Sequence, residues 1–479
     1  MRKLILLFIA FLFWLGLVAQ VHPEAALRQK GGFRDWAVGP PMGWNSYDAY
    51  YGCITERQFK GEVDALSKRM LPYGYEYAVI DYCWFNPGPK GWDPDYNWTT
   101  FDVGDFAGQT MDAYGRLSPA ENRFPSAKGG KGFGPIAAYV HSKGMKFGIH
   151  IMRGIPRTAV LGNTPILGTA LHAADIASLT DTCTWNGSMY GVDATKPGAQ
   201  AYYNSLLNLY ASWGVDFIKV DDISAPVYHQ REIDLIRHAI DRCGRKIVLS
   251  LSPGDAPMGS AQHADNTANM YRVINDVWDR WKDILHDFDI LNAWSPFTGN
   301  GTWPDGDMLP LGKLCLNGYP EAHNDPHSSR AEHFSYLSYA EQQTMLSLWC
   351  MARSPLIWGG SALWSADSTF ALLSNREVLA IDKNSIRNHQ LYLPDSRADN
   401  KQYRIWVAES PDRKTKYVAL FNLLDHPADL SFKPEWEFWK GRFACTELWT
   451  GMDKGILTDV LVAGAVSAHG VALYKLTAL

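Results

Sequence analysis

Two short stretches of the sequence each place a basic residue and a carboxylate on one face of the chain. Residues 215–221 are mostly apolar and suit a buried strand, in which Lys219 and Asp221 point the same way because side chains alternate. In residues 271–278, Arg272 and Asp276 fall on one face if the chain is extended. Charges at the end of a buried strand are costly to bury, which indicates a site that does chemistry.

Asp221 and Asp276 form a candidate carboxylate pair, and we interpret Asp221 as a catalytic nucleophile. A retaining glycosidase needs two carboxyl groups about 5–5.5 Å apart, one as nucleophile and one as acid/base. The structural alternative for a single aspartate at a strand end is a cap of the following loop. Two such residues, each with a basic neighbour, keep both interpretations open on the residues alone.

Other polar or aromatic residues fall at expected strand ends, namely Trp44, Asp81, His150 and Ser252. His150 by itself also suits a hydrogen-bonded core histidine. Segment 303–308 predicts a turn in which aspartates cap backbone amides, and it does not match a calcium-binding EF-hand loop. Zinc-binding motifs and phosphate-binding loops are absent from the sequence.

Strand-like and helical segments alternate over residues 39–385, which predicts a (β/α)8 TIM barrel. Helical patterns cover residues 55–70, 135–143, 198–213, 230–243 and 340–352. The expected strands are residues 42–45, 75–81, 145–151, 215–221, 246–252, 271–275, 288–292 and 355–359. Active sites of such barrels lie at the C-terminal ends of the strands, where both charged stretches end.

The pattern changes from about Leu391, where short alternating segments are separated by turn residues. Residues 391–479 therefore predict a C-terminal antiparallel β-sandwich domain. Its expected strands are residues 403–408, 416–421, 428–432, 443–448 and 471–476.

The N-terminus has the composition of a secretory signal peptide. Met1–Lys3 is basic, Leu4–Val18 is an unbroken apolar run, and small residues follow it. We expect residues 1–19 to be removed and residues 20–38 to form a lead-in to the barrel. The predicted product is an exported protein, periplasmic or extracellular, without a membrane anchor after cleavage.

The composition argues against nucleic-acid and membrane partners and against a fold that depends on many disulfides. The 479 residues carry a formal net charge of −5, which favours neither nucleic acid nor an anionic membrane surface. Seven cysteines are too few for a disulfide framework in a chain of this length. Cys53 and Cys83 are the pair we expect to form a disulfide, because each lies just beyond an expected early strand.

Several motifs in the same order resemble glycoside hydrolase family 27, the α-galactosidase family. Met42–Tyr47 resembles its MGWNSW motif, and 75–84 resembles its GYxYxxIDDCW segment. Residues 146–149, 216–221, 272–276, 303–309 and 469–473 also match segments of the family, so the resemblance covers about Gly39 to the C-terminus. It implies the barrel and β-sandwich, with no metal or organic cofactor.

The resemblance also implies roles for individual residues. Asp221 is the expected nucleophile and Asp276 the expected general acid/base. Lys219 and Arg272 are expected to donate to sugar hydroxyls, Trp44 to pack against the sugar ring, and Asp81 to accept from hydroxyls. With the departures from the family pattern included, the expected substrate-binding residues are Trp44, Asp81, Tyr82, His150, Lys219, Ser252 and Arg272.

Tyr82 is the departure that bears most on the substrate, because the family typically has a second aspartate there that holds the hydroxymethyl group of galactose. We expect a secreted retaining exo-glycosidase that removes terminal α-D-galactosyl residues from a glycan. The alternative substrate is a β-L-arabinopyranoside, which lacks the hydroxymethyl group and which other family members hydrolyse. A non-catalytic carbohydrate-binding protein on the same barrel is the alternative of a different class.

Overall fold

The computed structural model describes residues 31–87, 109–316, 331–391 and 402–479. Phe33–Leu479 form one compact unit, in which the barrel and the C-terminal sheets lie together. The predicted signal peptide falls outside the described residues, so its cleavage and the export of the protein stay predictions. Among the described residues, none of the helices has both the length and the apolar character needed to cross a membrane.

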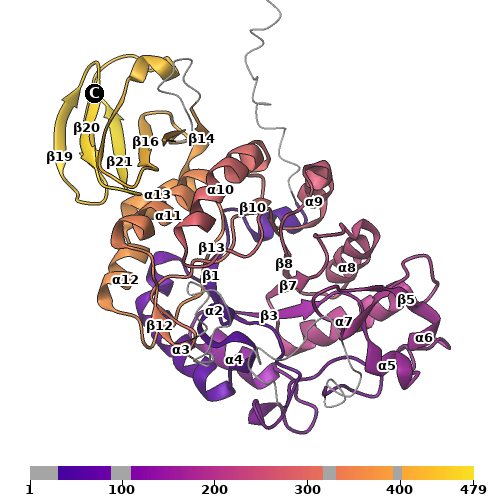
Figure 1. Cartoon of the computed structure of the whole chain (residues 1–479). Helices are drawn as coiled ribbons and strands as arrows, with labels where there is room; N and C mark the ends of the chain where they lie inside the picture. Colours follow the sequence, from indigo (N-terminus) through magenta and orange to yellow (C-terminus); the bar gives the residue numbers. More distant parts are fainter. Residues whose placement is uncertain (1–30, 88–108, 317–330, 392–401) are drawn as a thin grey trace, which may run out of the picture. The chain divides into compact units, whose positions relative to one another are not determined.

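Eight parallel strands form the barrel, with helices around them (Figure 1). In the order in which they pair, the strands are β10 (Trp303–Asp305), β9 (Met270–Arg272), β8 (Val248–Leu251), β7 (Phe217–Asp221), β3 (Lys146–Met152), β2 (Tyr77–Ile80), β1 (Met42–Asn45) and β13 (Leu356–Trp358). A parallel bridge between Leu309 and Trp358 joins the segment after β10 to β13 at the other end of this order. The predicted TIM barrel is confirmed.

Each of the five predicted helical segments matches a helix of the structure. The helices are α2 (Tyr47–Tyr50), α3 (Glu56–Arg69), α4 (Gly134–Ser142), α5 (Arg157–Leu161), α6 (Ala173–Ile176), α7 (Ala199–Trp213), α8 (Gln230–Arg242), α9 (Ala261–Thr267), α10 (Trp281–Trp294), α11 (Tyr339–Ala352), α12 (Asp367–Leu373) and α13 (Arg376–Asn384). The predicted segments match α3, α4, α7, α8 and α11. In α8, Ile233, Ile236 and Ile240 recur at helical spacing and are buried.

One expected strand is wrong, and the true strand lies in a segment that we predicted to be a turn. Residues 288–292 belong to α10, because Ile284, Phe288 and Leu291 repeat at helical spacing and are all buried. The missing barrel strand is β10, which includes Pro304. Proline lacks a backbone N–H and so suits a strand that pairs through a short ladder on one side, as β10 does with β9.

The strand that carries Lys219 and Asp221 starts from a sharp helix end. Helix α7 stops at Gly214, whose φ of +87° is left-handed and favours glycine. Val215 then donates to the carbonyl of Tyr210, and β7 begins two residues later. Phe217, on the same face as Lys219 and Asp221, packs in the apolar cluster inside the barrel. The predicted inward face of β7 is therefore confirmed.

An antiparallel sheet between β3 and α7 was not predicted from the sequence. It consists of β4 (Ile155–Pro156), β6 (Met189–Val192) and β5 (Ala177–Thr182), in that order of pairing. Its strands are short, with β5 half-exposed and β4 and β6 mostly buried, so their sequence lacks a strong alternating pattern. The connection between β5 and β6, residues 183–188, reaches the cavity described below.

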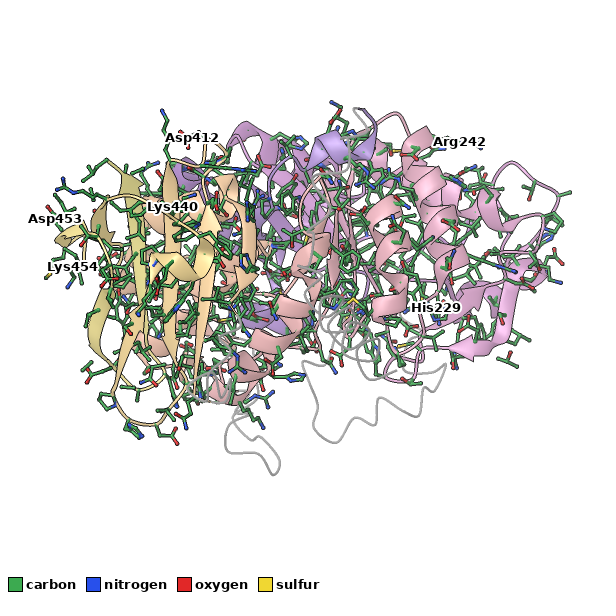
Figure 2. All side chains as sticks on the ribbon, turned by 90° about the horizontal axis from the view of Figure 1, so that it is seen from above. His229, Arg242, Asp412, Lys440, Asp453 and Lys454 are labelled. Atoms are coloured by element: carbon green, nitrogen blue, oxygen red, sulfur yellow. The ribbon has the colours of Figure 1, made fainter. Side chains whose placement is uncertain are left out.

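The C-terminal domain has two antiparallel sheets that share one apolar core. The larger contains β14 (Ile386–Gln390), β15 (Tyr403–Glu409), β16 (Thr415–Asn422), β21 (Val471–Ala478), β18 (Phe443–Glu447) and β19 (Asp453–Leu457), in that order; the smaller pairs β17 (Ala428–Phe432) with β20 (Leu461–Val466). Strand β14 begins before the predicted boundary at Leu391. A further small pair, β11 (Lys313–Leu314) and β12 (His333–Phe334), lies beside the barrel. Figure 2 shows the exposed charged side chains of Asp412, Lys440, Asp453 and Lys454 on the outside of the C-terminal sheets.

Candidate active site

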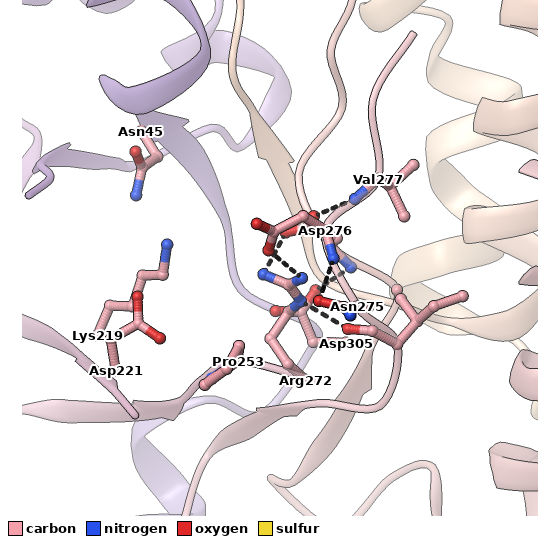
Figure 3. A network of polar contacts seen from close by, with 12 residues as sticks. Asn45, Lys219, Asp221, Pro253, Arg272, Asn275, Asp276, Val277 and Asp305 are labelled. Atoms are coloured by element: carbon pink, nitrogen blue, oxygen red, sulfur yellow. Dashed lines mark hydrogen bonds and ion pairs between the residues drawn. The ribbon is translucent and has the colours of Figure 1, made fainter. Parts of the chain in front are cut away.

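A cavity of about 640 Å³ lies at the C-terminal ends of the barrel strands. It has the size and the mixed apolar and polar lining that are usual for small-molecule sites. Figure 3 shows Lys219 and Asp221 on one side of the site and Arg272 and Asp276 on the other. The predicted residues that line it are Asp81, Tyr82, Lys219, Asp221, Ser252, Arg272 and Asp276.

The Asp221 carboxylate is held by two donors. Nε2 of His150 lies 3.0 Å from Oδ2 of Asp221, and the backbone N–H of Asp222 donates to Oδ1 at 3.0 Å. Burial alone raises the pKa of Asp221, but the His150 hydrogen bond and the Lys219 charge outweigh burial, so the pKa is lowered. Asp221 is therefore ionised at neutral pH and suited to attack a carbon atom as a nucleophile.

Asp81 and Lys219 form a buried ion pair beside Asp221. Nζ of Lys219 lies 3.2 Å from Oδ2 of Asp81, which also accepts from Nδ2 of Asn45 at 2.6 Å. Burial raises the pKa of Asp81, but the Lys219 ammonium and the Asn45 hydrogen bond outweigh it and lower the pKa to about 2. The pair presents a fixed cation and a fixed anion to the cavity, which suits hydrogen bonds to sugar hydroxyls.

Asp276 stands on the opposite wall in a more open position. Its Oδ1 lies 3.0 Å from Nη2 of Arg272, and the side chain is 66% exposed. Arg272 is almost completely buried and also pairs with Asp307 at 2.6 Å. Burial raises the pKa of Asp305, next to this pair, to about 7. An exposed carboxyl group opposite a half-buried, ionised one suits a general acid/base that works beside a nucleophile.

Two predicted substrate-binding residues do not line the cavity. Trp44 has no exposed surface, its Nε1 donates to Gly360, and it packs in the core against Tyr50 and Phe59, so it does not touch a sugar there. The reason is alternation: in β1, Asn45 faces the barrel interior, which turns Trp44 toward the helices. His150 is also fully buried, and it contacts Asp221 instead of the cavity.

Tyr82 forms a wall of the cavity together with the β5–β6 connection. Its hydroxyl accepts a hydrogen bond from Nδ2 of Asn186 at 2.6 Å, and its ring lies against those of His150 and Trp185. Tyr82 is 8% exposed and Asn186 is completely buried. The phenol is thus fixed, and its position depends on an insertion that comes about a hundred residues later.

Several residues that line the cavity were missed from the sequence. They include Tyr47, Trp185, Asp255, Trp278 and Met308. Trp278 follows Asp276 by two residues, so its place in the cavity was open to prediction from the charged stretch. Trp185 had no such signal, because it belongs to the unpredicted insertion.

The predicted disulfide between Cys53 and Cys83 is not shown by the structure, so this pairing stays a prediction. Arg123 joins the two turns that carry these cysteines. Its guanidinium donates to the carbonyls of Cys83 at 2.6 Å, Gly52 at 2.5 Å and Ile54 at 2.8 Å. With a further hydrogen bond to the carbonyl of Asn86 at 3.0 Å, this buried arginine makes four hydrogen bonds that hold the turns together.

Comparisons with known proteins agree with this geometry. A family model described as "Alpha galactosidase A" matches residues 190–384, and one described as "Alpha galactosidase C-terminal beta sandwich domain" matches residues 400–476. The chain is also 25% identical to an α-galactosidase of Oryza sativa subsp. japonica over 442 residues, which cover 91% of this chain and 84% of that protein.

Two proteins of known structure are more similar in sequence to this chain than that α-galactosidase is. A family 27 β-L-arabinopyranosidase from Geobacillus stearothermophilus, solved in complex with arabinose, is 41% identical, with a TM-score of 0.86 over 94% of this chain and 100% of that one. A putative α-N-acetylgalactosaminidase from Bacillus halodurans C-125 is 38% identical, with a TM-score of 0.78 over 92% and 97% of the two chains. With its barrel, β-sandwich and carboxylate-lined cavity, the chain belongs to glycoside hydrolase family 27 and is a glycoside hydrolase.

Proposed function

We propose that the protein is a retaining exo-glycosidase that hydrolyses β-L-arabinopyranosides in preference to α-D-galactosides. The observation that carries the proposal is the fixed Tyr82 phenol at the cavity wall, where the family pattern has a carboxylate. β-L-Arabinopyranose has the ring configuration of galactose without its hydroxymethyl group. A sugar without that group leaves no hydroxyl to be satisfied beside the tyrosine.

The reaction uses two steps at the anomeric carbon. Asp221 attacks while Asp276 protonates the glycosidic oxygen, which gives a covalent glycosyl-enzyme and releases the aglycone. Asp276, now a carboxylate, takes a proton from water, and that water displaces Asp221. The low pKa of Asp221 supports its role as the attacking anion, and the exposure of Asp276 supports contact with the aglycone and with water.

The preference for the arabinopyranoside follows from the hydrogen bonds that are available around Tyr82. Its hydroxyl already accepts from Asn186, and its neighbours on this side include the rings of His150 and Trp185. A galactose hydroxymethyl group placed here loses water without gaining a carboxylate partner, which costs about 1–3 kcal/mol. That cost corresponds to about a 10- to 100-fold preference for the pentose. The similarity to an arabinopyranosidase at 41% identity supports the same order.

α-Galactosidase activity is the second candidate, and it was the first expectation from the sequence. Asp81 and Lys219 line the cavity as a pair that suits galactose hydroxyls as well as those of arabinopyranose. The relative named α-galactosidase supports this candidate at 25% identity. The two sugars differ only at the carbon that faces Tyr82 in our proposal.

A panel of p-nitrophenyl glycosides tests the proposal on the purified protein. It compares β-L-arabinopyranoside, α-D-galactoside and N-acetyl-α-D-galactosaminide by kcat/KM. We expect the arabinoside to be hydrolysed at least about tenfold faster than the galactoside. Equal rates or a preference for either of the other two sugars overturns the proposed specificity, and binding without turnover of all three overturns the enzymatic role.

A further inference from the structure

Asp222, the residue after the candidate nucleophile, has a left-handed backbone. Its φ is +58°, a conformation that costs a non-glycine residue about 1 kcal/mol or more. This conformation aims the Asp222 N–H at Oδ1 of Asp221, to which it donates at 3.0 Å. A strained residue whose N–H touches a reacting carboxylate needs support from its surroundings.

Arg153 supplies that support from the end of β3. Its Nε donates to the carbonyl of Asp222 at 2.6 Å and lies 3.0 Å from Oδ2 of the same residue. The backbone N–H of Arg153 donates to the carbonyl of Asp221 at 3.0 Å. The arginine therefore holds both peptide carbonyls around the left-handed residue, and its side chain is only 3% exposed.

The guanidinium is itself fixed by carboxylates from two further elements. Nη2 lies 2.7 Å from Asp181 on β5, and Nη1 lies 3.3 Å from Glu232 on α8. Glu232 also accepts from the hydroxyl of Tyr203 on α7. A guanidinium offers a planar fork of donors, which lets one side chain bind several acceptors in a fixed orientation. Arg153 thus ties β5, β7 and α8 together at the end of β3.

The same carboxylates raise the alternative of a metal site. Asp181, His229 and Glu232 each offer a ligand atom within 4.8 Å of the others. Nη1 of Arg153, however, lies 3.1 Å from Asp181 and 3.3 Å from Glu232. The guanidinium therefore stands between these two carboxylates, and the cation of this cluster is the arginine.

We propose that Arg153 is a positioning residue for the nucleophile: it holds Asp222 in the left-handed conformation whose N–H orients the Asp221 carboxylate. Arg153 does not line the cavity, so it acts through Asp222 and not through the substrate. The inference rests on the proposed function in one respect, since it takes Asp221 as the nucleophile.

The test is Arg153→Met in the full-length protein. We expect kcat to fall about 100-fold, with KM within about threefold of wild type, because the sugar contacts stay and the reacting group moves. Trapping of the glycosyl-enzyme by an activated 2-deoxy-2-fluoroglycoside should slow by a similar factor. The control is Arg237→Met, which removes another buried arginine, on α8, that pairs with Asp241, and which should leave kcat within about threefold.

A second change separates positioning from general destabilisation. Glycine adopts φ of +58° without strain, so Arg153→Met/Asp222→Gly should recover at least about tenfold of the kcat lost in Arg153→Met. If Arg153→Met does not fold, Asp222→Ala and Asp222→Gly replace it. Both lack the carboxylate, and the alanine variant should have the lower kcat because only alanine is strained there.

The results that would overturn the role of Arg153 differ from those that would overturn the proposed function. Turnover by wild type and its loss in Asp221→Asn establish the nucleophile independently of Arg153. With these in hand, a folded Arg153→Met with wild-type kcat overturns the inference. So does a double variant that recovers nothing, or equal kcat for Asp222→Ala and Asp222→Gly.

Discussion

Nε2 of His150 lies 3.0 Å from Oδ2 of Asp221, on an imidazole with no exposed surface. Its other ring nitrogen, Nδ1, has no hydrogen-bond partner among the described residues. A buried N–H without a partner is more costly than a bare lone pair, so the tautomer that fits carries its proton on Nε2. His150 therefore donates to the nucleophile, a role that the sequence did not assign to it.

Replacing His150 by Phe should impair Asp221 as the nucleophile, while the phenyl ring fills the buried space of the imidazole. The loss of one donor raises the pKa of Asp221, so the acidic limb of the kcat/KM profile should move to higher pH and kcat should fall about tenfold. Rates from pH 3 to 8 measure both effects. His263→Phe is the control, since His263 binds Asp234 and Tyr228 away from the cavity. An unchanged acidic limb contradicts the role of His150.

Asp221→Asn should lower turnover at least about a thousandfold, because an amide does not form the glycosyl-enzyme. The side chains have the same shape, so the thermal midpoint of unfolding should stay within a few degrees of wild type. Steady-state kinetics and circular dichroism measure the two quantities. Undiminished turnover by a folded variant rules out Asp221 as the nucleophile.

Asp276→Ala should show a loss that depends on the leaving group. A nitrophenolate leaves with little help from an acid, whereas a sugar or alkyl alcohol needs a proton, so the loss should be about tenfold for the first and above about a hundredfold for the second. Because Asp276 is largely exposed, its removal should not disturb folding. Equal losses for both classes of leaving group argue against the acid role.

Asn186→Ala removes the donor that fixes the Tyr82 hydroxyl. The phenol oxygen then has one acceptor position open to the substrate, so the ratio of kcat/KM for arabinoside over galactoside should fall about three- to tenfold. Ser188→Ala is a matched control in the same connection, because the Ser188 hydroxyl has no hydrogen-bond partner among the described residues. A ratio that stays the same in Asn186→Ala removes the link between Tyr82 and specificity.

Asp305 should make stability depend on pH. Burial raises its pKa to about 7 in the folded protein, against about 3.9 in the unfolded chain, so the folded state binds an extra proton between these values. This contribution to stability is fully present below about pH 4 and is lost as the pH rises through about 7. Asp305→Asn keeps an acceptor for the Asp307 N–H without the charge. In urea unfolding, its stability relative to wild type should rise from pH 4.5 to 8; a constant difference contradicts this.

The sequence by itself determined what depends on local periodicity. The alternation of residues 215–221 placed Lys219 and Asp221 on one face, and the structure keeps them there, because a strand covered on both faces has no freedom to turn one side chain over. Helices such as α3 and α8 were equally predictable from apolar spacing and caps. Ordered motifs indicated family 27, since several short patterns in one order rarely coincide by chance.

Tertiary structure decided what depends on neighbours distant in the chain. Trp44 faces the core because Asn45 takes the interior position beside Asp81, a choice that β1 alone does not make. Tyr82 is fixed by Asn186, and Asp221 by His150 and by an N–H that Arg153 supports. These contacts join residues 69 to 104 positions apart, and only the closed barrel with its insertion brings them within hydrogen-bond distance. The sequence therefore predicts the carboxylates of Asp221 and Asp276, while the fold sets their ionisation and orientation.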